Sequence, residues 1–111
     1  MSTTRMELIE EMLEKNPEDT YLNFAAALEY KKQGSLKKAL ATFRKIIKLD
    51  PNYLPTYYQV GSLLESFDRV DEAITVYRKG LELAQERKDV TAVGELSEAL
   101  LILDEDIGQP W

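Results

Sequence analysis

Apolar residues recur along this chain with the 3.6-residue period of an α-helix, and polar residues fill the positions between them. Strong helix formers dominate these stretches, and no stretch alternates with the period of two that a strand requires. The pattern therefore predicts an all-α protein. The segments that carry it are 3–15, 20–33, 36–49, 53–66, 70–87 and 89–104.

Residues that end helices stand between the predicted segments. Gly34-Ser35 and Phe67-Asp68 close two of them. Asn16-Pro17 and Asp50-Pro51 follow two others, and we expect each Pro to be the first residue of the next helix, with Asp50 as an N-cap. Because the connections are short, neighbouring helices should run antiparallel.

The chain also repeats itself with a period of 34 residues, which is typical of stacked helix pairs. Ala39 aligns with Ala73 and Phe43 with Tyr77, so small and large residues keep their places in both copies. A bias in composition would not produce this agreement. One helix pair cannot bury its apolar face alone, and stacking a second pair on the first makes a continuous core.

Small residues recur where two helices would have to approach closely. Ala27 and Gly61 take this position in the first helix of each pair, and Ala39 and Ala73 take it in the second. We predict that all four are packing residues. An Arg at position 39 or 73 should cost several kcal/mol, on the order of the largest effects of overpacking and of burying a charge.

These positions resemble the pattern of the tetratricopeptide repeat (TPR) family, which has a large residue, a Leu-Gly pair, a Tyr, a small residue, an aromatic and a Pro. The second copy matches it with Tyr57, Val60-Gly61, Leu64, Ala73 and Tyr77, and has Gln85 in place of the Pro. The first copy has Tyr30, Ala39, Phe43 and Pro51 at the matching positions. There Asn23 stands in place of the opening large residue, and the Leu-Gly pair has become Ala26-Ala27.

The resemblance implies a short right-handed α-solenoid of two TPR-like helix-turn-helix repeats with flanking helices at both ends. On this interpretation residues 1–111 form a single domain. Its expected parts are an N-terminal helix 3–15, repeat 1 over 20–53, repeat 2 over 54–87, a C-terminal capping helix 89–104 and a flexible tail 105–111.

The resemblance also implies a binding surface, because in this family the first helices of the repeats line a concave groove that takes up peptides or helices of partner proteins. The family's groove positions correspond in repeat 1 to Tyr21, Phe24, Leu28, Lys31 and Lys32. They correspond in repeat 2 to Tyr58, Ser62, Glu65 and Ser66, and in the capping helix to Asp89, Ala92 and Leu96. The alternative for Tyr21, Phe24 and Leu28 is that the N-terminal helix covers them as ordinary core.

Members that bind chaperone tails grip a C-terminal carboxylate with Lys, Asn and Arg side chains of successive first helices. At the corresponding positions this chain has Phe24, Leu28, Gln59, Asp89 and Val93. The carboxylate clamp is therefore essentially absent, and we do not expect chaperone-tail binding.

The composition argues against an enzyme. The chain has no Cys and no His, which removes thiol nucleophiles, imidazole bases and the commonest metal ligands. No Gly-rich phosphate loop is present, and adjacent carboxylates such as Asp71-Glu72 point in different directions on a helix. We therefore expect no catalysis, no metal and no cofactor.

Charge and hydropathy limit the partners further. No apolar run is long enough for a membrane span or for the core of a signal peptide, so a cytoplasmic location without membrane binding is expected. The net charge of −6 disfavours nucleic acid. Between Lys31 and Leu49, however, lie seven basic residues and no acidic one. That run is either a solvated helix face or a surface for an acidic partner segment.

Two functions follow from these observations. The first is a non-catalytic module that binds a protein or peptide partner in the groove. The alternative is a structural protein that forms homodimers or larger homo-oligomers through the groove or the capping helix, with Trp111 of the tail docking into a neighbouring copy.

Overall fold

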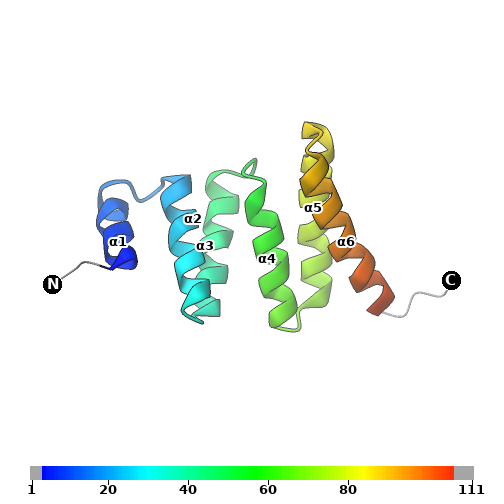
Figure 1. The fold of residues 1–111 in the computed structure, drawn as a ribbon, viewed down its shortest axis with the longest axis horizontal. Helices are drawn as coiled ribbons and strands as arrows, with labels where there is room; N and C mark the ends of the chain where they lie inside the picture. The colour runs from blue at the N-terminus through cyan, green and yellow to red at the C-terminus, as the bar shows by residue number, and fades with distance from the viewer. Residues whose placement is uncertain (1–3, 107–111) are drawn as a thin grey trace. The chain divides into compact units, whose positions relative to one another are not determined.

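The computed structural model describes residues 4–106, and within this range every regular element is an α-helix (Figure 1). The all-α prediction is thereby confirmed, and each predicted helix end lies within two residues of the observed one. Most of the predicted flexible tail 105–111 lies outside the described residues, and α6 continues through Asp106. The helices are α1 (Arg5–Lys15), α2 (Thr20–Lys32), α3 (Leu36–Leu49), α4 (Pro55–Ser66), α5 (Val70–Arg87) and α6 (Val90–Asp106).

The chain divides into two compact units, Met1–Thr56 and Tyr57–Trp111. Among the described residues, no helix is both long and apolar enough to cross a bilayer.

Side chains cap the first two helices. Thr4 and Glu7 form a reciprocal capping box at the start of α1, and the Asp19 carboxylate accepts a hydrogen bond from the Leu22 amide, 2.9 Å away, at the start of α2. The expectation that Pro17 and Pro51 begin helices is wrong. Both lie in the turn after a helix, a position that suits Pro because it cannot continue the preceding helix.

The expected start of the helix after Asp50-Pro51 is also wrong. Asp50 is the C-cap of α3 rather than an N-cap, and its amide donates to the carbonyl of Ile46. Pro55 is instead the first residue of α4. A Pro at this position costs no helical hydrogen bond, because the first amides of a helix have no partner within it.

In the first unit, α2 packs against both α1 and α3. Met6 and Ile9 of α1 form a cluster with Ala26 of α2. On the side toward α3, the predicted packing residues Ala27 and Ala39 are both fully buried, as the sequence indicated. The small side chains of Ala27 and Ala39 let the backbones of α2 and α3 approach closely. The larger Phe43 and Ile46 are also fully buried and fill the rest of this core.

In the second unit, glycines let aromatic rings lie directly on a helix backbone. A Cβ atom on Gly61 of α4 would overlap the Tyr77 ring of α5, and a Cβ atom on Gly80 would lie 2.7 Å from Cβ of Tyr57. The prediction that Gly61 is a packing residue is therefore confirmed. Gly80 plays the same part, although the repeat pattern did not single it out.

Candidate partner-binding surface

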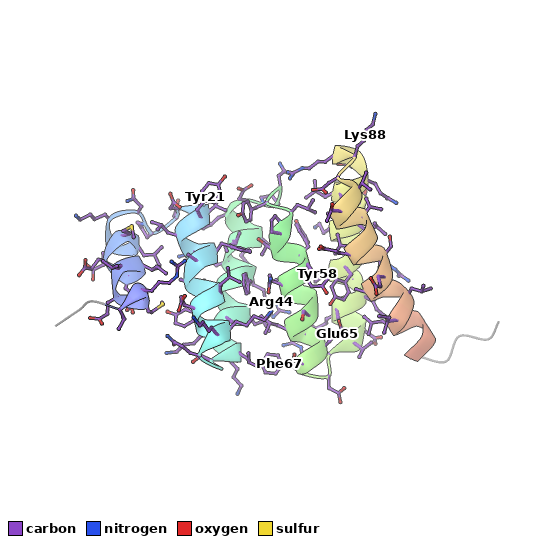
Figure 2. All side chains as sticks on the ribbon, viewed as in Figure 1. Tyr21, Arg44, Tyr58, Glu65, Phe67 and Lys88 are labelled. Atoms are coloured by element: carbon purple, nitrogen blue, oxygen red, sulfur yellow. The ribbon has the colours of Figure 1, made fainter. Side chains whose placement is uncertain are left out.

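The N-terminal end of α2 carries an aromatic cluster that leaves one ring exposed. The Tyr21 ring meets the Tyr53 ring edge to face at a centroid distance of 5.6 Å, and 72% of Tyr21 remains exposed (Figure 2 labels Tyr21). Phe24, one turn further along, packs edge to face on both Phe43, at 5.3 Å, and Tyr53, at 5.4 Å. Phe24 is thus the base of the cluster, and Tyr21 is the ring that it presents to solvent.

Tyr53 connects these rings from the turn that follows α3. Burial raises the pKa of its phenol, and the neighbouring Tyr21 and the Asp50 carboxylate raise it further. The phenol therefore stays neutral at physiological pH and can act as a hydrogen-bonding group beside Tyr21. The sequence pattern placed Tyr53 at the start of the predicted helix 53–66 and not on the candidate surface, whereas the structure places it in the turn before α4.

The exposed side of α2 continues from this cluster to the end of the helix. Leu28 is 38% exposed, Lys31 is half-buried and Lys32 is exposed. Basic side chains in the last turn also complement the partial negative charge at a helix C-terminus. The predicted residues of repeat 1 thus combine apolar area with positive charge.

The N-terminal helix does not cover this surface. The side chains that pack against the cluster of Met6, Ile9 and Ala26 are Leu13, Ala25 and Tyr30. Tyr21 and Leu28 lie elsewhere on α2 and remain exposed. The alternative that they are ordinary core covered by this helix is wrong, and Phe24 is partly buried by Phe43 and Tyr53 instead.

In the second unit, Tyr58 and Glu65 lie on α4 (Figure 2). Tyr77 of α5 contacts both. The Tyr58 and Tyr77 rings are 5.9 Å apart, and Tyr58 is 40% exposed. The buried Tyr77 hydroxyl donates a hydrogen bond to the Glu65 carboxylate. Burial, followed by this hydrogen bond and the charge of Glu65, raises the pKa of the Tyr77 phenol.

The hydroxyl of Tyr77 thus fixes the position of Glu65, one of the predicted surface residues. Ser62, one turn earlier on α4, is half-buried, and its carbonyl accepts a hydrogen bond from the Ser66 hydroxyl at 3.2 Å. This surface is more polar than that of repeat 1.

The C-terminal helix α6 contributes fewer residues to the candidate surface than the sequence predicted. Leu96 is only 2% exposed and belongs to the core of the second unit, where its Cδ1 lies beside Gly80. An inward-facing Leu cannot contact a partner while the unit is folded, so we remove it from the candidate surface. Asp89 is the N-cap of α6, and its carboxylate accepts a hydrogen bond from the Ala92 amide at 3.1 Å.

The two repeats have equivalent pairs of aromatic residues but differ in charge. The pairs Phe24–Phe43 and Tyr58–Tyr77 occupy equivalent positions, 34 residues apart. Lys31 of the first repeat, however, corresponds to Glu65 of the second. The equivalent surfaces of the two repeats therefore differ in the sign of their charge at this position.

The described part of the chain holds no group of three or more Asp or Glu side chains that could bind a metal ion. The exposed aromatic, aliphatic and charged side chains of the two first helices can make contacts with a polypeptide.

A family model for the tetratricopeptide repeat matches the chain twice, over residues 20–53 and 54–87. Hsp70-Hsp90 organizing protein 2 of Arabidopsis thaliana is 36% identical over 74 residues, which cover 65% of this chain. The chain spans only 13% of the length of that relative.

Two solved structures are similar over most of the chain. A tetratricopeptide repeat domain protein of Salinibacter ruber is 37% identical with a TM-score of 0.75, and the match covers 78% of this chain and 97% of that one. The TPR2B domain of yeast Sti1, solved in complex with pHsp70, is 19% identical with a TM-score of 0.81. That match covers 91% of this chain and 81% of the other, and at this identity it concerns the fold alone.

Proposed function

This chain belongs to the tetratricopeptide repeat family, and from that premise we propose that it is a non-catalytic interaction module that binds a peptide or a helix of a protein partner. The binding residues in this proposal are Tyr21, Phe24, Leu28, Lys31, Lys32, Tyr58, Ser62 and Glu65. They lie on the first helices of the two repeats, where the family places its groove.

The observation that carries the proposal is a pair of exposed tyrosines, each held by an aromatic neighbour. Tyr21 rests on Tyr53, and Tyr58 rests on Tyr77. An aromatic ring that is already oriented contributes a large contact area and loses little conformational entropy on binding. An exposed ring of this kind does little for the core, so partner binding gives a reason for its presence.

The charges on the surface suggest the chemistry of the bound segment. Lys31 and Lys32 favour an acidic side chain near the aromatic cluster of repeat 1, whereas Glu65 favours a basic or hydrogen-bond-donating group at repeat 2. Each repeat would thus favour a bound segment that combines an apolar anchor with a charge or hydrogen-bonding group opposite to its own.

The C-terminal tail of a chaperone is not the partner that we propose, although the Arabidopsis relative is named for Hsp70 and Hsp90 and the yeast domain was solved with pHsp70. At the clamp positions, Phe24 is packed among aromatic rings and Asp89 is engaged as a helix cap. Neither side chain can stabilise a carboxylate as Lys or Arg would.

The test is affinity capture of partners from the native lysate, followed by mass spectrometry, with the wild-type chain, Tyr21→Ala and Tyr58→Ala. Val90→Ala is the matched control, because it also removes an exposed side chain from a helix. We expect the tyrosine variants to lose at least one partner by tenfold or more, as hot-spot residues do, and the control to keep it. An unchanged partner set would count against the proposed surface.

Self-association is a second candidate, favoured by adjacent exposed apolar residues on α6. Leu101 is 55% exposed and Ile102 is 49% exposed. The position of Trp111, which we also considered for this role, lies outside the described residues. Light scattering over a wide concentration range tests the idea: a concentration-dependent mass that Leu101→Glu abolishes would support it, and a strict monomer would exclude it.

A further inference from the structure

The outward face of α3 carries basic side chains and no acidic one. We call Lys37, Lys38, Arg44, Lys45 and Lys48 the α3 basic face. All four lysines are exposed and Arg44 is half-buried (Figure 2 labels Arg44 on this helix). At 1.5 Å per residue, the face extends about 16 Å along the helix.

The repeat provides an internal comparison, because the fold does not demand this charge. The equivalent face of α5 has Asp71, Glu72, Arg78, Lys79 and Glu82. It is thus mixed in sign, as a face that is merely solvated would be. A fully basic face is more notable in a chain whose net charge is −6.

Helix stability accounts for Lys48, which stands in the last turn, but not for the rest of the basic face. Lys37 and Lys38 stand in the first turn, where the helix dipole disfavours cations, and the Ser35 side chain makes no capping hydrogen bond there. Arg44 and Lys48 form a like-charge pair at a spacing of four residues, which also disfavours the helix. The equivalent first turn of α5 has the favourable Asp71 and Glu72.

Local contacts explain only part of the face. The Lys45 ammonium donates to the Pro17 carbonyl at 3.0 Å, and the Lys38 ammonium lies 5.8 Å from the centre of the Tyr30 ring. Lys37 and Lys48 lie at opposite ends of the face. Ala41, which is small and exposed, lies between them near the middle of the face.

We propose that the α3 basic face is a second docking surface, which binds an acidic helical segment of a protein partner. The proposal is independent of the surface on the first helices. The cations recur at a spacing of three to four or seven residues, so glutamates at the same spacing on one face of a partner helix would oppose them. The small Ala41 lets such a helix approach closely.

A protein segment is favoured over nucleic acid by two features. Residues 36–42 and 44–49 of α3 include no aromatic side chain on which a base could stack, and the Tyr30 ring beside Lys38 is half-buried. The negative net charge of the chain would also repel a long polyanion more strongly than a short acidic helix.

The experiment is a fluorescence anisotropy titration of the full chain with a synthetic Glu/Ala helical peptide. Its glutamates are placed four, seven and eleven residues after the first one. A peptide of the same composition with its glutamates spread around the helix is the control probe. The variants are Lys37→Glu/Lys48→Glu and, as the matched control on α5, Arg78→Glu/Lys79→Glu. Both double variants change the net charge by the same amount, and all four side chains are exposed.

We expect the one-faced peptide to bind more tightly than the spread one. Lys37→Glu/Lys48→Glu should weaken it at least tenfold, and the α5 variant should weaken it less than threefold. The amide shifts in an NMR titration should lie on α3. Thermal unfolding provides a check on folding. Glu at position 37 complements the helix dipole and Glu at position 48, in the last turn, opposes it, so the two effects should largely cancel and Tm should change little.

Three results would overturn the proposal. They are equal weakening by the two double variants, no preference between the two peptides, and tighter binding of a single-stranded oligonucleotide or of anionic vesicles than of the one-faced peptide. Loss of binding by the α3 variant would leave the capture experiment with Tyr21→Ala and Tyr58→Ala unaffected, so failures of the two proposals are distinguishable.

Discussion

At the scale of single residues, two equivalent buried positions hold side chains of opposite relative size in the two repeats. Repeat 2 has the large Tyr57 and a Gly at position 80, in contact with each other. The equivalent positions of repeat 1 hold the smaller Asn23 and the larger Ile46, both buried. The Asn23 side chain also donates hydrogen bonds to the carbonyls of Pro17, at 3.0 Å, and Asp19, at 2.8 Å. A buried amide thereby has its donors satisfied, which its burial requires.

Two glycines allow backbone conformation to be tested without any change in packing. Gly34 has φ of +82°, and Gly94 lies within α6, yet a Cβ atom would meet nothing within 4 Å at either site. Gly34→Ala should lower the free energy of unfolding by about 1–2 kcal/mol, because an L-residue is disfavoured in the left-handed region. Gly94→Ala should raise it by about 0.5–1 kcal/mol, because Ala is the better helix former.

Urea unfolding of the two variants beside the wild type measures both values. Effects of the same sign at the two sites would contradict the conformational explanation.

At the scale of secondary-structure elements, Tyr77 joins α5 to α4 by two different contacts. Its ring lies where a side chain on Gly61 would be, and its hydroxyl reaches Glu65. The pKa of the phenol is raised above the ordinary value of 10.0, so the folded chain holds this proton more tightly than the unfolded chain does. The corresponding stability is complete below pH 10 and falls as the pH rises further, because only the unfolded chain then ionises readily.

Tyr77→Phe should therefore change how stability depends on pH. At pH 8 the variant should lose about 0.5–1.5 kcal/mol with the hydrogen bond to Glu65. Between pH 10 and 12 the wild type should lose up to about 1.4 kcal/mol per pH unit from this group, and the variant should not. The difference in free energy of unfolding should thus shrink or reverse at high pH. Parallel pH curves for the two proteins would rule this explanation out.

At the scale of the whole molecule, charge is divided unevenly along the chain. Residues 1–56 have nine basic and eight acidic side chains, whereas residues 57–111 have five basic and twelve acidic ones. The second unit thus carries a net charge of −7 and the first +1. Within the first unit, the four acidic residues of α1 and the five residues of the α3 basic face occupy separate helices.

This excess of acidic side chains should make stability depend on salt. Like charges repel more strongly in the compact state than in the unfolded chain, and salt screens that repulsion. Raising NaCl from 0.02 to 0.3 M should therefore raise Tm by roughly 4 °C, if about 1 kcal/mol of repulsion is relieved. Calorimetry at several salt concentrations measures the change, and a Tm that falls with NaCl would show that favourable ion pairs dominate instead.

Much of the fold was predictable because it depends on short-range interactions. The helix ends at Leu36, Leu49, Val70 and Arg87 followed from periodicity and turn residues. The buried Ala27, Gly61, Ala39 and Ala73 followed from the 34-residue repeat. The assignment of residues 1–111 to one domain, the cytoplasmic location and the absence of a cofactor stay predictions. So do the roles of the candidate surface residues.

The amino-acid sequence alone determined the helices, the repeat and the small residues at the close contacts, because each is encoded in residues that are near in sequence or separated by a constant period. Only the tertiary structure decided which predicted surface residues are exposed. Tyr21 stays exposed because α1 packs elsewhere on α2, Phe24 is held by Tyr53 from a turn, and Leu96 is buried beside Gly80. Exposure depends on contacts between side chains distant in sequence, and helical periodicity does not distinguish one covered face from another.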